Sequence, residues 1–283
     1  MRTLVSGDFH LRLDKPPLRP AEEDWMELQK YSLLALTCEM EDDPELDLII
    51  VGDILHRSRP AFEVIHLFDD IFDSFKKDRM CVLPGNHDLL YHDIKNKDKA
   101  GYGGIYRRYH QFIDGQIFPI LDGKMLMLTH QLTFPDEKSK PTMSGGKTAQ
   151  ELLDEFPDAQ WILVGDYHRA FHYEKDGRHV INPGCMTRQS IDFFDYTPSY
   201  YIIDWDTGKV ERKPFPDSFP LDMSFIQDSR ERDQRLGSFV ETVKGGKGIE
   251  GLDFEGNLKT LANNKEVPEE VRELMNTVLE EVR

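Results

Sequence analysis

Long apolar runs are missing from this sequence. None of its apolar stretches reaches 18 residues, which excludes a conventional membrane-spanning helix. The first polar motif begins at Asp8, which leaves no space for a removable signal segment, so we expect a cytoplasmic protein without membrane contacts. The chain has 283 residues, of which 39% are hydrophobic, enough for one substantial core plus an appendage.

Cysteine is scarce. Its three residues, Cys38, Cys81 and Cys185, are odd in number and far apart in the chain. This pattern excludes a disulfide framework and a zinc knuckle of the C-x-x-C type. We therefore expect reduced thiols.

Positive charge is also in short supply. Lys and Arg number 35 against 52 Asp and Glu, which gives a formal net charge of -17 at pH 7. Such a chain repels a polyanion at long range, so a nucleic acid has to be held by local features such as metal ions or by a partner chain. The acidity does not exclude a nuclease.

Short apolar segments that end in polar residues recur along the chain. They are strand-like, and they read "MRTLVSGDFH", "LDLIIVGD", "MCVLPGNHD", "KMLMLTH" and "WILVGDYH". A helix is predicted from Trp25 to near Pro44. A second is predicted from Pro60, in its first turn, with Phe62, Ile65, Phe68 and Phe72 on one side. Later segments predict hairpins that turn at Asp176-Gly177 and Thr207-Gly208. This order predicts an α/β domain over residues 1–216 and a helical C-terminal extension over residues 217–283.

The polar residues that follow these strands have the chemistry of metal ligands. They are Asp8, His10, Asp53, Asn86, His87, His130, Asp166 and His168. In α/β sheets the loops after the strands converge on one crevice. Carboxylate, imidazole and amide donors without cysteine suit Mn²⁺ or a similar ion, and the number of donors fits two ions that act on a phosphoryl group. Any one motif alone is weak evidence, since D-x-H is common by chance and G-N-H-D can be a simple turn.

Taken together, these motifs resemble a known family. The segments "GDFHL", "GDILHRSRP", "GNHD", "LTHQ" and "GDYH" are similar to the successive signatures of calcineurin-like metallophosphoesterases. "GDILHRSRP" and "NPGCMTR" resemble more narrowly the SbcD-type branch of DNA double-strand-break nucleases. The resemblance covers roughly residues 1–210. It implies a four-layer α-β-β-α sandwich, two Mn²⁺ ions, DNA as substrate and a separately encoded SMC-like ATPase of the SbcC type as partner.

The resemblance also implies residue roles. One ion would take Asp8, His10, Asp53 and His168, and the other would share Asp53 and add Asn86, His130 and Asp166. His87 would lie beside the scissile phosphate, and His56 would help to protonate the leaving oxygen, as a histidine that titrates near pH 6.5 is able to do.

Asp166 departs from the family pattern, which usually has a histidine there (G-H-x-H). Aspartate is a competent ligand for Mn²⁺ or Mg²⁺, so we expect both ions to bind, with a weakened second site as the alternative. His172 is a nearby candidate to replace the missing imidazole, although a surface or core histidine is the plainer interpretation.

Three arginines are candidates for substrate binding. Arg57 and Arg59 lie beside His56 in the sequence, where they would contact a DNA backbone or simply solvate a helix start. Arg188 follows an Asn-Pro-Gly sequence, which would bring N–H groups and this arginine to a phosphate or form an ordinary tight turn.

The hypotheses for function come from different classes. The first is a Mn²⁺-dependent DNA exonuclease and endonuclease. The second is a phosphatase or cyclic phosphodiesterase with the same metals, and the third is a non-catalytic scaffold whose second metal site is impaired by Asp166. The apolar stripe of the terminal helix would pack on the catalytic body or serve a partner or homodimer interface; it comprises Val271, Leu274, Met275, Val278, Leu279 and Val282.

Overall fold

The chain divides into two units, residues 1–225 and 226–283. This computed structural model describes residues 1–19, 24–73, 79–92, 110–111, 114–120, 123–141, 144–190, 193–216, 221–222, 224 and 269. The predicted helical extension and its apolar stripe therefore lie outside the described residues, apart from a few isolated positions. The first unit contains both of the large sheets.

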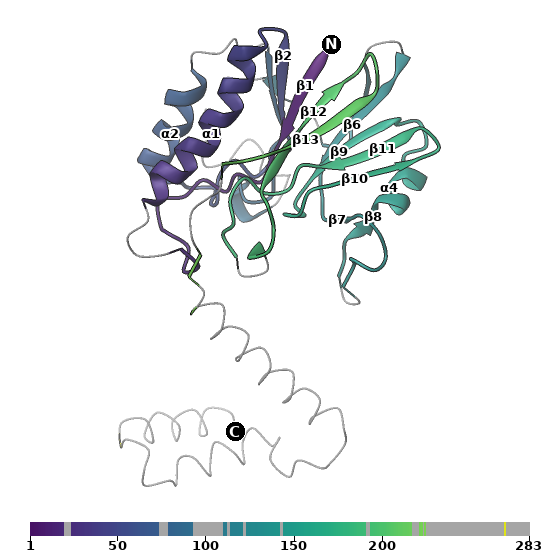
Figure 1. Cartoon of the computed structure of the whole chain (residues 1–283). Coiled ribbons are helices and arrows are strands. Elements are labelled where there is room, and N and C mark those ends of the chain that lie inside the picture. Colours follow the sequence, from purple (N-terminus) through teal and green to yellow (C-terminus); the bar gives the residue numbers. More distant parts are fainter. Residues whose placement is uncertain are drawn as a thin grey trace. The chain divides into compact units, whose positions relative to one another are not determined.

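A six-stranded mixed sheet forms one half of this unit (Figure 1). Its strands, in spatial order, are β13 (Lys209–Pro214), β12 (Ser199–Asp204), β1 (Arg2–Ser6), β2 (Leu46–Ile50), β3 (Met80–Val82) and β4 (His110–Gln111). The pairs from β1 to β4 are parallel, whereas β12 runs antiparallel to both β1 and β13. The first strand of the chain therefore lies in the middle of this sheet.

A five-stranded sheet forms the other half. Its order is β10 (Phe171–Lys175), β11 (Arg178–Asn182), β9 (Trp161–Gly165), β6 (Met125–His130) and β5 (Ile117–Pro119). The three central strands are parallel, and the two edge strands are antiparallel to their neighbours. A small parallel pair, β7 (Thr133–Phe134) and β8 (Lys147–Thr148), precedes the helix α4 (Ala149–Glu155).

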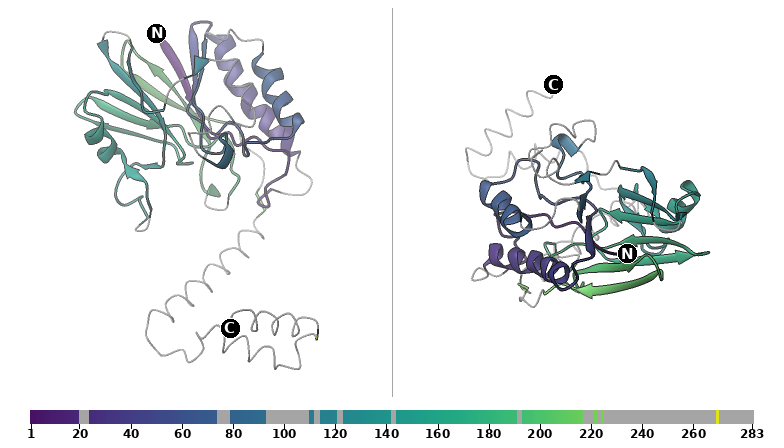
Figure 2. Two further views of the ribbon diagram at one scale, coloured as in Figure 1. Left: turned by 180° about the vertical axis from the view of Figure 1, so that it is seen from behind. Right: turned by 90° about the horizontal axis from the view of Figure 1, so that it is seen from above.

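Helices cover the outer faces of the two sheets. Figures 1 and 2 show α1 (Trp25–Asp42) and α2 (Phe62–Phe72) on one side and α4 (Ala149–Glu155) on the other. Three apolar clusters separate the layers, and they include Leu36 with Phe68, Leu163 with Ile203, and Leu152 with Val180. The predicted four-layer α-β-β-α sandwich is confirmed. Within the described residues, none of the helices combines the length and apolar character needed to cross a bilayer.

The two predicted helices form, with one correction. Asp24 caps α1 by accepting a hydrogen bond from the Glu27 N–H at 3.2 Å, and the helix ends just before Pro44, as expected. In α2, however, Ala61 is the N-cap, so Pro60 lies outside the first turn. Phe62 is 69% exposed, while Val64 is buried with Phe68. The buried face of α2 is thus shifted from the predicted stripe: Phe68 and Phe72 are buried as expected, but Val64 and Ile71 are buried in place of Phe62 and Ile65.

Both predicted hairpins are present. Lys175 is opposite Arg178, and Asp176 and Gly177 between them have φ angles of 53° and 73°, the left-handed pair that a two-residue turn requires. The other hairpin joins Asp204 to Lys209 through a turn with Gly208 at φ 72°. These hairpins fix the register of β10 with β11 and of β12 with β13.

Candidate metal centre

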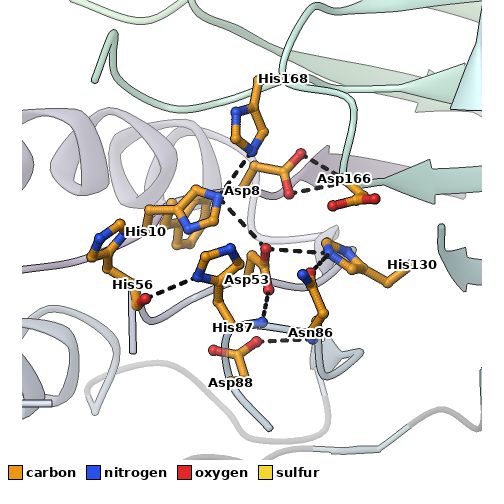
Figure 3. A network of polar contacts seen from close by, with 12 residues as sticks. Asp8, His10, Asp53, His56, Asn86, His87, Asp88, His130, Asp166 and His168 are labelled. Atoms are coloured by element: carbon orange, nitrogen blue, oxygen red, sulfur yellow. Dashed lines mark hydrogen bonds and ion pairs between the residues drawn. The ribbon is translucent and has the colours of Figure 1, made fainter. Parts of the chain in front are cut away.

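The eight predicted ligand-type residues come from the carboxyl ends of parallel strands in both sheets. Asp8 and His10 follow β1, Asp53 follows β2, Asn86 and His87 follow β3, His130 ends β6, and Asp166 and His168 follow β9. Figure 3 shows these side chains around Asp53. The structure therefore brings the predicted set together.

Backbone hydrogen bonds hold the first two ligand loops side by side. The N–H groups of Asp8 and His10 donate to the carbonyls of Gly52 and Asp53 at 3.0 and 2.9 Å. Leu11 continues this ladder by donating to Ile54. The pairing of β1 with β2 thus continues beyond the strands. It fixes the backbone positions from which the Asp8, His10 and Asp53 side chains project.

Four of the candidate ligands have left-handed backbones. The φ angles are 48° at Asp8, 46° at His10, 50° at Asp53 and 80° at Asp166. Residues other than glycine rarely adopt this conformation, and when it persists it is concentrated at functional sites. The left-handed backbones therefore mark these four positions as candidates for a functional site.

Asp53 lies at the centre of the cluster and is fully buried. Its Oδ1 accepts a hydrogen bond from the His87 N–H at 2.8 Å. Among the described residues, none donates a hydrogen bond to its Oδ2, although His10 Nε2 and His130 Nε2 lie 3.5 and 3.3 Å away. A buried carboxylate oxygen without a donor, faced by two imidazole nitrogens, is what a divalent cation would complete. The residues present fit a metal.

Three compact groups of ligand-type atoms lie at this centre; one consists of His10, His56 and His87, and the other two contain Asp8. The ligand atoms of Asp8, His10 and His168 lie within 4.8 Å of one another, with the two Nε2 atoms 3.0 Å apart. The second group consists of Asp8, Asp53 and His130, and Asn86 Oδ1 lies 3.1 Å from His130 Nε2. Asp8 belongs to both groups, a position that the family resemblance gives only to Asp53.

Close backbone contacts hold His130 in place. Its Nδ1 is 2.7 Å from the carbonyl oxygen of Val51, which leaves Nε2 to face Asp53. Gly52, at φ 100°, and Gly165 lie against the ring: a Cβ on them would lie 2.2 and 2.4 Å from Nδ1. Only glycine fits at these two positions.

Asp166 contacts the cluster through its backbone N–H. Its backbone N–H donates to both carboxylate oxygens of Asp8 at 3.2 Å, but within the described residues its own carboxylate joins none of the compact ligand groups. His172 does not replace it, because His172 lies on β10 with its Nε2 3.0 Å from His179 Nδ1. The role of Asp166 as a ligand therefore stays a prediction.

His56 and His87 lie beside the ligand groups. Their rings are stacked with centroids 5.6 Å apart, and His87 Nδ1 is 3.0 Å from the His56 carbonyl oxygen. Burial, followed by the positive charges of Arg12 and His87, lowers the pKa of His56 to about 4. This pKa is lower than the value near 6.5 at which an unperturbed histidine titrates. A bound phosphate, being negative, would raise this pKa.

The protonation states of the buried groups in the cluster depend on one another. Burial disfavours a charged His130, but the negative charge of Asp53 outweighs it and raises the pKa of His130 to about 10. At Asp53, burial acts to raise the pKa, but the interaction with His130 outweighs it. The pKa of Asp53 is therefore lowered. Burial is the main cause that raises the pKa of Asp8 and lowers those of His10 and His168. Most of the imidazoles are thus neutral and available as ligands.

One buried carboxylate that supports the site was not singled out in the sequence. Asp88 accepts hydrogen bonds from the N–H groups of Leu55 at 2.8 Å, Gly85 at 2.9 Å and Ile54 at 3.3 Å. It thereby ties the loop after β3 to the loop after β2. The signal was present as the last letter of G-N-H-D, an acidic residue beside two ligand-type residues.

The Asn-Pro-Gly turn supports the site in a similar way. The Asn182 amide donates to the carbonyls of Tyr167 and Arg169, the latter at 3.1 Å, and the Cys185 N–H donates to His168 at 3.0 Å. Gly184 has φ 73°. The turn therefore holds the loop that carries Asp166 and His168. Its predicted contact with a phosphate stays a prediction.

The candidate arginines are distributed over two places. A cavity of ≈ 170 Å³ is lined by His10, His56, His87, His168 and Arg12, among others, and a groove of ≈ 480 Å³ is lined by Arg12, His56, Arg57 and Arg59. Arg12 was missed in the sequence, and it borders both. Asp14 lines the groove too and pairs with Arg12 and, at 3.6 Å, with Arg57. Arg188 instead donates to the carbonyl of Phe194 at 3.2 Å, within its own loop.

Comparison with known proteins identifies the class. The chain belongs to the calcineurin-like phosphoesterase family, whose profile matches residues 1–202. The family and the cluster of ligand-type residues support a metal-binding hydrolase. No curated protein sequence matches the chain.

Solved structures with a similar fold are distant in sequence. An archaeal phosphodiesterase is 17% identical, with 76% of this chain and 100% of that chain covered and a TM-score of 0.44. Vps29 from Entamoeba histolytica, in complex with zinc, is 13% identical over 78% and 96%, with a TM-score of 0.43. A putative 5'-nucleotidase from Staphylococcus aureus is 12% identical over 82% and 57%, with a TM-score of 0.47. At this distance no property of the three transfers to this chain.

Proposed function

We propose that this protein is a Mn²⁺-dependent DNA nuclease, with both exonuclease and endonuclease activity, that works with an SMC-like ATPase of the SbcC type in DNA repair or recombination. The observation that carries this proposal is the groove lined by Arg12, Arg57 and Arg59, which adjoins the histidine-lined cavity through Arg12 and His56. A phosphomonoester needs cations only at its one phosphate. A polynucleotide also needs them along the path on which its backbone leaves the reacting phosphodiester.

The residues around the centre suit this reaction. Asp8, His10, Asp53, Asn86, His130 and His168, with Asp166 as a further candidate, would hold two ions. When bound, the ions would activate the attacking water and neutralise the reacting phosphate. His87 and His56 face the same cavity, where His87 would contact the scissile phosphate and His56 would donate a proton to the leaving oxygen. Carboxylate and amide oxygens beside the imidazoles, without cysteine, suit Mn²⁺ or a similar divalent ion better than a structural zinc site.

The charge of the chain favours a partner. A net charge of -17 opposes long-range attraction of DNA, so the arginines of the groove act only at close range. A separate ATPase subunit would supply most of the grip on DNA. The same argument makes the protein alone a poor binder of DNA at physiological salt.

Substrate class is tested by a direct comparison. Purified protein with Mn²⁺ is incubated with single-stranded DNA, double-stranded DNA and a chromogenic phosphomonoester. The proposal predicts cleavage of DNA well above turnover of the monoester. Turnover of the monoester alone would support the phosphatase hypothesis instead.

His56 gives a sharper test of the mechanism. His56→Ala is expected to keep the Mn²⁺ content of the wild type and to lose most DNA cleavage, roughly a hundredfold or more for a general acid. His66→Ala, an exposed histidine on α2, is the matched control and should change neither. Unchanged cleavage by His56→Ala would remove its assigned role.

The non-catalytic scaffold remains a second candidate because of one observation. Among the described residues, the carboxylate of Asp166 joins no compact ligand group. Counting Mn²⁺ ions by calorimetry separates the candidates. Two ions per chain support the nuclease, whereas one ion or none, together with absent DNA cleavage, supports the scaffold.

A further inference from the structure

The β10–β11 hairpin carries three further side chains of metal-ligand type on one face. His172 and Glu174 are two residues apart on β10, and His179 on β11 is directly opposite Glu174. The alternating residues Phe171 and Val180 pack towards α4. The three polar side chains therefore share the opposite face of the hairpin.

The three side chains converge. His172 Nε2 lies 3.0 Å from His179 Nδ1, and Glu174 Oε2 lies 3.9 Å from the same Nδ1. All three ligand atoms lie within 4.8 Å of one another. Two imidazole nitrogens on one tetrahedral zinc ion are separated by about 3.3 Å, given Zn–N bonds of about 2.0–2.1 Å. The observed separation is within a few tenths of an ångström of that value.

One ligand of this cluster is held in place. The His179 ring stacks on Trp161 with a centroid distance of 3.8 Å and an interplanar angle of 14°, and its side chain is 12% exposed. His172 and Glu174 are exposed, so an ion can reach the cluster from solvent. Burial is the main cause that lowers the pKa values of His172 and His179, which leaves both imidazoles neutral at neutral pH.

We propose that His172, Glu174 and His179 form a binding site for a late first-row divalent ion, Zn²⁺ in particular, distinct from the centre around Asp53. Two imidazoles and one carboxylate favour Zn²⁺ or Ni²⁺ over Mg²⁺ and Mn²⁺. The open coordination positions take water or a ligand from another molecule. Trp161 begins β9 and Gly165 ends it, so the hairpin site and the Asp166 loop are separated by about 13 Å of extended strand.

An ion at this site would also restrain the Asp53 centre indirectly. It would join β10 to β11 across the hairpin, and Asn182 at the end of β11 holds the loop of Asp166 and His168. The site therefore has a structural role: Zn²⁺ would stabilise the hairpin from which that loop is held.

The stacking of His179 on Trp161 provides the measurement. Ni²⁺, which quenches tryptophan fluorescence at short range, is titrated into the full-length protein. The wild type is expected to show saturable quenching that Zn²⁺ reverses and an equal concentration of Mn²⁺ does not. His172→Ala keeps the stacked His179 and should raise the half-saturating Ni²⁺ concentration by at least about tenfold. His66→Ala is the matched control and should behave as the wild type.

Asp53→Asn separates this site from the other centre. This variant is expected to keep the Ni²⁺ quenching. Adding His172→Ala to Asp53→Asn should remove one bound Zn²⁺ per chain. Circular dichroism checks that both variants are folded. Equal quenching in the wild type and His172→Ala would overturn the proposal. So would quenching that is lost in Asp53→Asn but kept in His172→Ala, because the ion would then be at the Asp53 centre.

Discussion

Asp53 and His130 form the pair on which the centre's response to pH depends. Without metal, the pKa of His130 is raised to about 10, so at pH 6 to 9 this imidazole carries a proton. A metal ion needs the neutral imidazole. Binding therefore has to release that proton.

We expect the affinity for Mn²⁺ to rise with pH up to about pH 10, where His130 loses its proton unaided. Calorimetry in two buffers of different ionisation enthalpy measures the protons released. His130→Gln should release one proton fewer than the wild type. Equal proton release by both proteins would show that His130 is already neutral.

In the metal-free protein, by contrast, the stability that the Asp53–His130 pair contributes falls as the pH rises. The folded-state pKa of His130 lies above its unfolded value of about 6.5, so its contribution to stability is complete below that pH and is lost as the pH rises through about 10. Bound metal replaces the proton in this range. Metal should therefore stabilise the fold most at alkaline pH.

Asp88 is the residue on which the geometry of two loops depends. Asp88→Asn places an amide N–H against backbone donors that now meet a carboxylate, so we expect a loss of about 1–3 kcal/mol in the free energy of unfolding. Urea denaturation measures it. Asp154→Asn, at an exposed position on α4, is the control and should stay within about 0.5 kcal/mol. A similar midpoint for both variants would contradict the role given to Asp88.

At the scale of single residues, the types of residue that form the site are easier to predict from the sequence than their geometry is. The donor chemistry of Asp8, His10 and Asp53 and their places after strands were sufficient to predict a shared site. The sharing of Asp8 by two ligand groups and the pKa of His56 could not be predicted, since both depend on distances across the two sheets. Arg12 was missed because its approach to His56 depends on the course of the loop after β1.

Among the elements, β9 pairs with β6 in parallel, and Gly165 is opposite His130. Gly165→Ala would place a Cβ 2.3 Å from the Val51 carbonyl oxygen and 2.4 Å from His130 Nδ1. We expect this variant to displace His130 and to weaken Mn²⁺ binding by about tenfold or more. Calorimetric titration measures the loss.

Gly145→Ala is the matched control, because nothing lies within 4 Å of its added methyl group. It should bind Mn²⁺ as the wild type does. If both alanine variants bind equally well, the contact of Gly165 with His130 does not limit the site.

Strands and hairpins were easier to predict than the face of a helix. The turn at Asp176-Gly177 follows from local backbone preferences alone. The orientation of α2 does not, because its four phenylalanine and isoleucine positions offered one apolar stripe, whereas contact with α1 and the sheet selected Val64 and left Phe62 in solvent. Tertiary packing decides between such stripes.

The molecule as a whole carries a negative net charge, whereas the charged residues that line the groove are mostly arginines. If Arg57 and Arg59 contact phosphates, Arg57→Ala/Arg59→Ala should reduce the slope of log affinity against log salt by about 1.4 for single-stranded and about 1.8 for duplex DNA. Fluorescence anisotropy over a salt series measures the slope. Lys175→Ala/Lys209→Ala, with the same change of charge at exposed positions, should leave the slope unchanged. Equal slopes in all three proteins would exclude the arginines from the DNA path.

The place of β12 has a consequence for the timing of activity. All the candidate ligands of the Asp53 centre precede Arg169 in the chain, yet β1, which leads into Asp8, is flanked on one side by β12, whose residues come some 200 positions later. A nascent chain still on the ribosome can therefore contain every ligand while the strand that completes their support has not emerged. Hydrolysis of phosphoesters should begin only after synthesis has passed this strand, so we expect an unfinished chain to be inactive.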